Sequence, residues 1–140
     1  MKKVILLLSA IVICLIGFIL NYKIDSNKVI KEILPQKEQV IDEAHFVFKP
    51  IYEYNKKQKK LKLLVEITSY IHDDLLNLNY KEISMVEFNN ELYKAIEYKI
   101  IEKSKHKLIA NIIFNPTNFQ STQPFGIRLF TYSDNEINWN

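Results

Sequence analysis

The longest apolar stretch of the chain lies close to its N-terminus. Residues 4–20 carry no charged side chain, and Lys2 and Lys3 come directly before them. As a helix these residues reach about 25 Å, because each residue rises ~1.5 Å, and an extension to Tyr22 adds a few ångströms more. The pattern predicts a single membrane anchor over residues 1–22.

A charged start followed by an apolar stretch also occurs in cleaved signal peptides. Those have a shorter apolar region and small residues at positions −3 and −1 of the cleavage site. Here the best late site follows Ser26 and has Ile24 at position −3, which is unsuitable. We therefore expect an uncleaved anchor, with a secreted form after signal cleavage as the alternative.

The charges around the apolar stretch bear on its orientation. The number of positive charges alone favours a cytoplasmic C-terminal domain, because more lysines follow the stretch than precede it. The four that follow are Lys23, Lys28, Lys31 and Lys37. Against this, a short basic N-terminal tail usually stays in the cytoplasm, and long domains are translocated largely regardless of charge. We expect a single-pass protein of the cell membrane, with a cytoplasmic N-terminus and an extracytoplasmic C-terminal domain.

Two alternating segments predict a β-hairpin. Residues 45–54 and 61–69 alternate between apolar and polar side chains, and their apolar faces carry Phe46, Phe48, Pro50, Tyr52, Tyr54, Leu61, Leu63, Val65 and Ile67. Pairing Tyr54 with Leu61 also places two opposite-charge pairs on the other face, Glu53 with Lys62 and Lys49 with Glu66. This register leaves residues 55–60 as the turn. Pro50 indicates that the first strand is an edge strand or carries a bulge.

Three other segments favour helices. In residues 84–103, Ser84 and Glu87 fit a capping box, and apolar residues recur at helical spacing: Met85, Phe88, Leu92, Ile96 and Ile100. Residues 26–44 carry a shorter apolar stripe, which Pro35 interrupts. They would form a helical, membrane-proximal linker over residues 23–44. Residues 70–83 fit a strand or a short helical turn, and we favour the turn.

The last part of the chain adds two strands. Residues 107–114 read as a buried strand, 115–124 as a loop, 125–132 as a final strand and 133–140 as a tail. Strands and helices in this order predict an α+β fold, with an antiparallel sheet and one main packed helix. The small α+β domain would cover residues 45–140.

Composition excludes several classes of function. The net charge of +3 falls to +1 without Lys2 and Lys3, and lysine outnumbers arginine 18 to 1, so bulk charge does not favour nucleic acid as a partner. Gly126 is the only glycine after the apolar stretch, which excludes a glycine-rich nucleotide loop. Cys14 is the only cysteine, which excludes a disulfide within the chain. We expect no cofactor and no metal.

The strongest local charge signal is a run of lysines. Lys56, Lys57, Lys59 and Lys60, here called the lysine tip, fall at the predicted hairpin turn, followed by Lys62. The simplest interpretation is a solvated turn that blunts a sheet edge. The functional alternatives are contact with anionic lipid headgroups or with an acidic partner.

Two further candidates are weaker. The loop 115–124 resembles a recognition loop, with Asn118, Phe119 and Gln120 as candidate contacts, although an ordinary connector explains it equally simply. His72 precedes two aspartates, an arrangement that metal sites and acid–base sites use, but a strand end followed by a helix cap accounts for it better.

Together these observations predict a membrane-anchored, non-catalytic binding or accessory domain. It would act outside the cytoplasm on a protein partner at the membrane surface. The lysine tip and the loop 115–124 are the candidate partner contacts. The alternative is a domain that holds a small ligand in a pocket lined by Phe48, Tyr52 and Tyr54.

Overall fold

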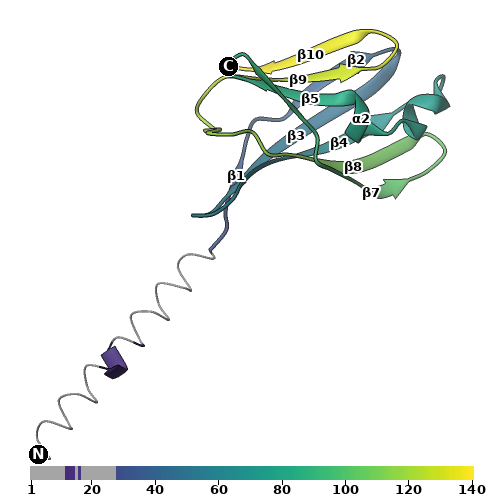
Figure 1. Ribbon diagram of the computed structural model, residues 1–140. Coiled ribbons are helices and arrows are strands. Elements are labelled where there is room, and N and C mark those ends of the chain that lie inside the picture. The colour runs from purple at the N-terminus through teal and green to yellow at the C-terminus, as the bar shows by residue number, and fades with distance from the viewer. Residues whose placement is uncertain (1–11, 15, 17–27) are drawn as a thin grey trace, which may run out of the picture.

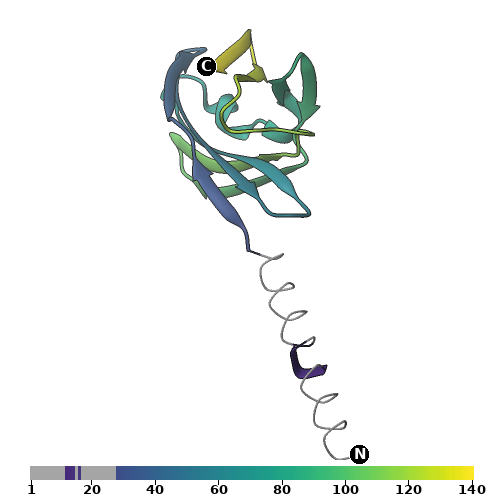
Figure 2. The same ribbon diagram turned by 90° about the vertical axis from the view of Figure 1, so that its left-hand side faces the viewer.

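Two antiparallel sheets form the domain, as the computed structural model describes it for residues 12–14, 16 and 28–140. Figures 1 and 2 show the sheets as two layers. The first sheet has the order β1–β3–β4–β8–β7, and β2 also pairs with β3. Its strands are β1 (Ile30–Ile33), β2 (Lys37–Ile41), β3 (Ala44–Tyr54), β4 (Lys59–Thr68), β7 (Glu97–Lys103) and β8 (Lys107–Phe114).

The second sheet has the order β10–β9–β5–β6. Its strands are β5 (Ser84–Phe88), β6 (Glu91–Lys94), β9 (Phe125–Phe130) and β10 (Asp134–Trp139). Between β4 and β5 lie the 3-10 helix η1 (Asp73–Asn77) and the α-helix α2 (Tyr80–Ile83), so the short helical turn expected over residues 70–83 is confirmed. The prediction of an α+β fold is wrong, because residues 28–140 form a mostly β sandwich whose helices are five and four residues long.

The predicted main helix over residues 84–103 is instead the three strands β5, β6 and β7. Along β5 the buried residues Ser84, Val86 and Phe88 alternate with half-buried ones, so the inward face has the period of a strand. Asn89 and Asn90 both have positive φ, 52° and 61°, which suits the tight turn of a hairpin. The hydrogen bonds that β5 makes with β9, and β7 with β8, outweigh the capping box and the helical spacing of apolar residues.

The helix expected over residues 26–44 is also wrong, because residues 30–41 form β1 and β2 along the edge of β3. The predicted tail is wrong as well, because residues 134–139 form β10. In that strand Ile137 and Trp139 alternate inward and are about 4% exposed. Both segments alternate too briefly for their pairing to be recognised without the neighbouring strand.

The predicted hairpin is confirmed, with its register shifted by two residues. Tyr52 lies opposite Leu61, and Tyr54 lies opposite Lys59, so the turn covers residues 55–58. A shift of two residues keeps every side chain on its face, and the predicted apolar positions from Phe46 to Ile67 therefore still face the core. The strands predicted at 107–114 and 125–132 are confirmed as β8 and β9, and 115–124 is the loop between them.

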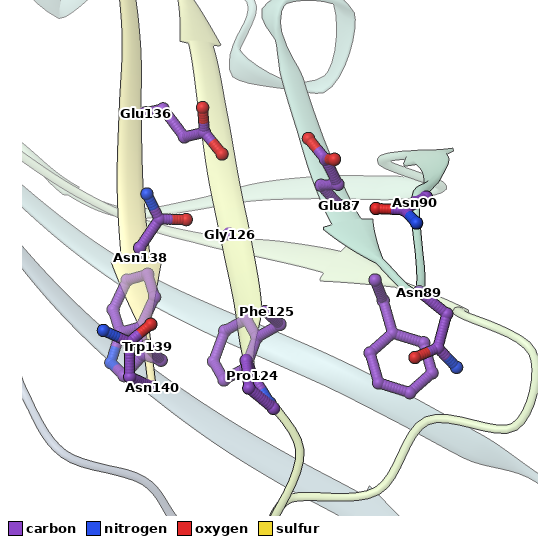
Figure 3. A pocket seen from close by; sticks show the side chains of 11 residues that line it. Glu87, Asn89, Asn90, Pro124, Phe125, Gly126, Glu136, Asn138, Trp139 and Asn140 are labelled. Carbon is purple, nitrogen blue, oxygen red and sulfur yellow. The ribbon is translucent and has the colours of Figure 1, made fainter.

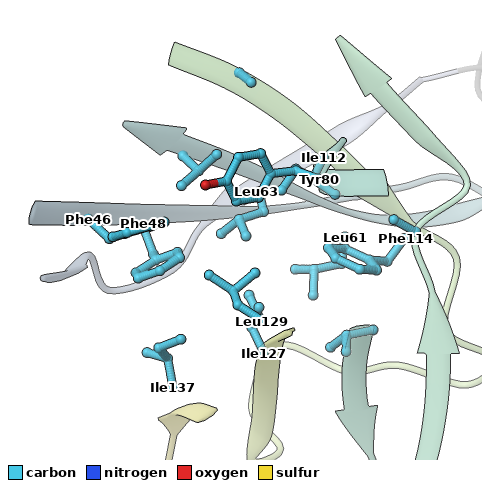
Figure 4. Packing of buried hydrophobic residues seen from close by; sticks show 14 of the residues in the cluster. Phe46, Phe48, Leu61, Leu63, Tyr80, Ile112, Phe114, Ile127, Leu129 and Ile137 are labelled. Atoms are coloured by element: carbon cyan, nitrogen blue, oxygen red, sulfur yellow. The ribbon is translucent and has the colours of Figure 1, made fainter. Parts of the chain in front are cut away.

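The core lies between the two sheets. Figure 4 shows that residues of β3, β4 and β8 face residues of β9 and β10; among those buried are Phe46, Phe48, Leu61, Leu63, Ile112, Phe114, Ile127, Leu129 and Ile137. Tyr80 of α2 closes one side and donates a hydrogen bond from its hydroxyl to the carbonyl oxygen of Leu75, 2.9 Å away. Burial raises the pKa of Tyr80, so the hydroxyl stays protonated as a donor.

Pro50 explains why β1 and β2 are separate strands. The Leu34 amide donates to the Pro50 carbonyl oxygen at 3.0 Å, so the side of Pro50 that lacks an N–H faces the gap between β1 and β2. Ile33 pairs with Ile51 and Lys37 with Phe48, which leaves three residues on one side opposite two on the other. β3 is thus not an edge strand, and the bulge lies on the strand opposite Pro50.

Trp139 joins the second sheet to this bulge. Its indole Nε1 donates to the Pro35 carbonyl oxygen at 2.7 Å, and its ring stacks on Phe125 with centroids 4.9 Å apart. Lys37 lies over the same ring, with its Nζ 5.5 Å from the centroid. The indole therefore satisfies a carbonyl group that the bulge removes from the ladder.

A second link between the sheets lies at the other end of β2. Asp42, in the turn between β2 and β3, accepts hydrogen bonds from Thr131 Oγ1 at 2.5 Å, from the Tyr132 amide at 3.1 Å and from Ser133 Oγ at 2.9 Å. These three residues form the turn between β9 and β10. A carboxylate that accepts several hydrogen bonds holds the two turns together.

The structure also bears on the predicted anchor. Among the residues described, no helix is long and apolar enough to cross a membrane. Most of residues 1–22, on which the predicted anchor falls, lie outside the described part of the chain. The membrane-proximal segment 23–44 enters the described part at residue 28 and contributes β1 and β2 to the first sheet.

Glu66 forms the ion pair that the hairpin predicted, although the register differs. Its carboxylate lies 4.0 Å from Lys49 Nζ, a diagonal rather than a directly opposite contact, and 2.7 Å from Lys107 Nζ. The hydrogen bond from Lys107 holds the pKa of Glu66 below its usual range, with further help from Lys49. The other predicted pair is not formed: Glu53 lies opposite Lys60 and pairs with Lys31 at 3.1 Å.

We expect Trp139→Phe to lower the free energy of unfolding by about 1 kcal/mol, because it keeps an aromatic ring but leaves the Pro35 carbonyl without its donor. Trp139→Ala should cost about 3–5 kcal/mol, because it also empties a core position. Urea unfolding followed by circular dichroism measures both. Equal stability of Trp139→Phe and the parent chain would show that the hydrogen bond contributes nothing.

We expect Glu66→Gln to reduce stability at neutral pH by at most about 1 kcal/mol, the usual limit for exposed ion pairs. Because the folded pKa of Glu66 is lowered, its contribution is present above the unfolded value and disappears as the pH falls through the folded pKa. The difference between variant and parent should therefore shrink in acid. Unfolding at a series of pH values measures this, and a constant difference would contradict it.

Candidate functional site

A polar groove lies on the outer face of the second sheet, over Gly126 (Figure 3). It is a hollow of about 350 Å³ at the ends of β5 and β10 and the start of β9. We call it the Gly126 groove; its lining residues are Glu87, Phe88, Asn89, Asn90, Pro124, Phe125, Gly126, Glu136, Asn138, Trp139 and Asn140.

The hollow exists because residue 126 has no side chain. Gly126 lies between Glu87 of β5 and Asn138 of β10, directly opposite both. A Cβ atom at this position would lie 2.6 Å from Asn138 Oδ1 and 3.1 Å from Glu136 Oε1. A glycine in a strand interior often marks a close approach by another group. Here it leaves room above the sheet between two rows of polar side chains.

Two carboxylates and one guanidinium set the charge of the groove. Arg128, one outward position further along β9, pairs with Glu87, and its Nη2 lies 3.8 Å from Glu136 Oε2. The guanidinium therefore holds carboxylates from the two strands on either side of β9. With two acids and one base, this surface is slightly acidic.

Amide side chains supply the rest of the polar rim. Asn89 and Asn90 are exposed in the turn after β5, and Asn138 and Asn140 are exposed at the end of β10. Each amide offers two donor hydrogens and one acceptor oxygen. Phe88, Phe125 and Trp139 are 5% exposed or less, so their rings belong to the core beneath the groove. The surface suits a polar ligand that both donates and accepts hydrogen bonds.

The side chains of the groove can hold a ligand through hydrogen bonds and charge. Among its lining residues there is no serine, threonine, cysteine or histidine to act as a nucleophile or an imidazole base. An ordinary solvated sheet face also carries alternating charged residues, as this one does. The hollow at Gly126 distinguishes it from such a face.

The structure places the lysine tip at the turn between β3 and β4. Lys56 and Lys57 lie in the turn, whereas Lys59 and Lys60 begin β4. Asn55 shapes the turn, because its Oδ1 accepts hydrogen bonds from the backbone amides of Lys57 and Gln58, both at 2.8 Å. The lysine tip is part of the first sheet and contributes nothing to the Gly126 groove.

The loop 115–124 contributes a buried side chain to the core as well as exposed ones to the surface. Phe119 is fully buried, and its ring centroid lies 5.0 Å from those of Tyr52 and Phe88. The Tyr52 hydroxyl donates to the Phe119 carbonyl oxygen at 2.8 Å, and burial raises the pKa of Tyr52. Of the three candidate contacts in this loop, only Asn118 and Gln120 are exposed.

His72 and its neighbouring aspartates do not form a metal site. His72 Nε2 lies 3.5 Å from a carboxylate oxygen of Glu43, and Asp73 and Asp74 are exposed in η1. Across the described part of the chain, no three histidine, cysteine or acidic residues are grouped so that they could hold a metal ion. The backbone amide of His72 donates to Ser69 Oγ at 3.0 Å, which ends β4 with a local turn.

Sequence analysis missed the Gly126 groove, although one signal for it was present. Gly126 is the only glycine after the apolar stretch, and it falls inside a predicted strand, where glycine is unfavourable. The asparagine side chains at the end of β10 were not predicted as contacts, because residues 133–140 were expected to be a tail. Comparison with protein-family models, with curated proteins and with solved structures finds no match for this chain.

Proposed function

We propose that the chain is a membrane-tethered, non-catalytic binding domain outside the cytoplasm. Its partner would be a protein of the envelope, and the contact site would be the Gly126 groove. The tether is the apolar stretch 4–20, for which the support is its length, its lack of charge and the poor cleavage site after it.

The proposal rests on the polar side chains that line the groove. Small-molecule sites are usually concave and mostly apolar, whereas the Gly126 groove is rimmed by amides and carboxylates. An extended polypeptide presents regularly spaced N–H and C=O groups, which asparagine side chains can match. The acidic pair Glu87 and Glu136 further favours a segment that carries a lysine or an arginine.

The alternative, a small ligand held by aromatic side chains, has less support. Phe48 and Tyr52 are 0% and 5% exposed. Phe48 packs edge-on against Trp139, and Tyr52 packs against Tyr54 and Phe119. The rings of Phe48 and Tyr52 thus lie in the interior of the sandwich, and that of Tyr54 is half-buried at its edge. The polar groove is therefore the better candidate for a contact site.

Tethering would strengthen a weak interaction. Holding a domain at the membrane makes its encounter with a membrane partner effectively intramolecular, with an effective concentration set by the linker. Only seven residues separate Leu20 from Lys28, the first described residue of the domain. A short linker restricts the groove to partners that lie near the membrane surface.

We expect a reporter enzyme that is active only outside the cytoplasm to be active when fused after Asn140. The chain should also keep its N-terminus, as measured by mass spectrometry, because the site after Ser26 is poor. The matched control is the same fusion without residues 1–22, which should be inactive. An inactive full-length fusion would place the domain in the cytoplasm, and a shortened N-terminus would indicate a secreted form.

We expect a photo-crosslinking amino acid at Asn90 to give a discrete adduct in the native cell. The same amino acid at Asp74, exposed in η1, should not. Gly126→Val should abolish most of the adduct, because its side chain fills the hollow and displaces Asn138. Lys94→Val, an exposed change on the same sheet that does not line the groove, is the control.

Equal adducts at Asn90 and Asp74 would contradict the assignment of the groove, as would an adduct that Gly126→Val leaves unchanged. Circular dichroism and thermal unfolding of Gly126→Val should match those of the Lys94→Val control. This comparison separates loss of the groove from loss of the fold.

A further inference from the structure

The lysine tip lies beside the point where the chain enters the sandwich. Ile30, the first residue of β1, lies opposite Tyr54, and Tyr54 lies opposite Lys59 across the turn. Because β1 and β3 are antiparallel, the chain before Ile30 leaves the sheet in the direction of the turn. Val29 accordingly lines the same hollow of about 250 Å³ as Asn55, Gln58 and Lys60. Both views place β1 and this turn at one end of the sandwich (Figures 1 and 2).

Charge is concentrated at this end. Residues 28–33 and 53–60, here called the basic end, contain six lysines and two glutamates, a net charge of +4. Residues 28–140 as a whole have 16 basic and 15 acidic residues, so everything outside the basic end has a net charge of −3. The charge of the domain is therefore strongly polarised, although its sum is close to zero.

Exposed apolar side chains accompany these lysines. Val29 and Ile30 are 48% and 46% exposed, and Ile33 is 80% exposed, although all three lie in or beside a strand. Lysines that surround exposed aliphatic side chains are typical of surfaces that rest on a membrane. There the apolar groups enter the boundary between headgroups and acyl chains, and the ammonium groups reach the lipid phosphates.

The hydrogen bonds of the turn hold the lysine tip in place. The Asn55 amide donates to the Gln58 carbonyl oxygen at 2.9 Å, in addition to the two hydrogen bonds that its side chain accepts. Because the backbone of the turn is already ordered, contact with a surface restricts only the lysine side chains. The lysine tip is thus pre-arranged at the end of the domain.

The length of chain before the domain brings the basic end to the membrane. From Leu20 to Lys28 the chain advances eight residues, at most about 28 Å if extended and ~12 Å if helical. The headgroup layer itself adds several ångströms on each side of the hydrocarbon. Even fully extended, these residues keep the basic end within about 28 Å of the end of the apolar stretch, so the headgroups lie within its reach.

We propose that the basic end sits on anionic lipid headgroups of the same membrane that holds residues 4–20. This inference rests on the proposed tethering of the domain. The attraction adds up over the lysines and acts only within about one screening length of the surface. The basic end belongs to the first sheet, so contact with lipid leaves the Gly126 groove on the second sheet open to a partner.

The test uses the full chain in lipid nanodiscs, with Cys14→Ser and a single fluorophore at Gln58→Cys. A nitroxide carried on lipid headgroups quenches a fluorophore that lies close to them. We expect several-fold stronger quenching at residue 58 in discs that contain phosphatidylglycerol than in discs of phosphatidylcholine alone. About 1 M salt should remove this difference, because the screening length then falls to about 3 Å.

The controls separate the lysine tip from other effects. A fluorophore at Asp74→Cys, in η1 away from the basic end, should be quenched weakly in both kinds of disc. The difference at residue 58 should disappear when the lysine tip is changed to glutamine. It should persist when the same number of exposed lysines is changed elsewhere: Lys81, Lys94, Lys99 and Lys105.

Two outcomes would overturn the proposal in different ways. If residue 58 is quenched equally with and without phosphatidylglycerol, or no more than residue 74, the lipid contact is wrong and the tether stands. If the chain elutes apart from the discs on gel filtration, the tether itself is wrong, and the lipid contact is lost with it.

Discussion

The missing backbone donor of Pro50 determines how the sandwich closes. Because Pro50 cannot donate to its neighbour, the strand beside β3 breaks into β1 and β2, with one extra residue opposite the proline. The break leaves the Pro35 carbonyl without a ladder partner, and the indole of Trp139 binds it. A residue of the second sheet thereby satisfies a defect of the first sheet, and the C-terminal strand β10 becomes part of the core.

The domain carries two surfaces with different properties, one on each sheet. The basic end belongs to the first sheet and lies where the chain enters the domain, whereas the Gly126 groove belongs to the second sheet and is slightly acidic. A domain that rests on lipid through one sheet keeps the other sheet available for a protein. This arrangement is how one small sandwich would serve both a membrane and a partner.

Sequence patterns located strands well where alternation was long. Residues 45–54 and 61–69 each alternate over at least eight residues, so the inward face of both strands was predictable, and the mostly apolar run 107–114 indicated a buried strand. The register of the first hairpin was shifted by two, because such a shift keeps every side chain on its face and conserves one ion pair diagonally. The turn geometry set by Asn55 decides the register, and apolar patterning does not reveal it.

The sequence by itself determined the apolar N-terminal stretch, the hairpin and its inward face, and the position of the lysine tip. Only the tertiary structure decided that residues 84–103 form strands, because their apolar residues fit helical and alternating spacing alike. Pairing of β5 with β9 and of β7 with β8 selects the strands. It also decided that Phe119 fills the core and that Gly126 opens a groove. Both depend on which strands become neighbours, a long-range choice that local patterns do not record.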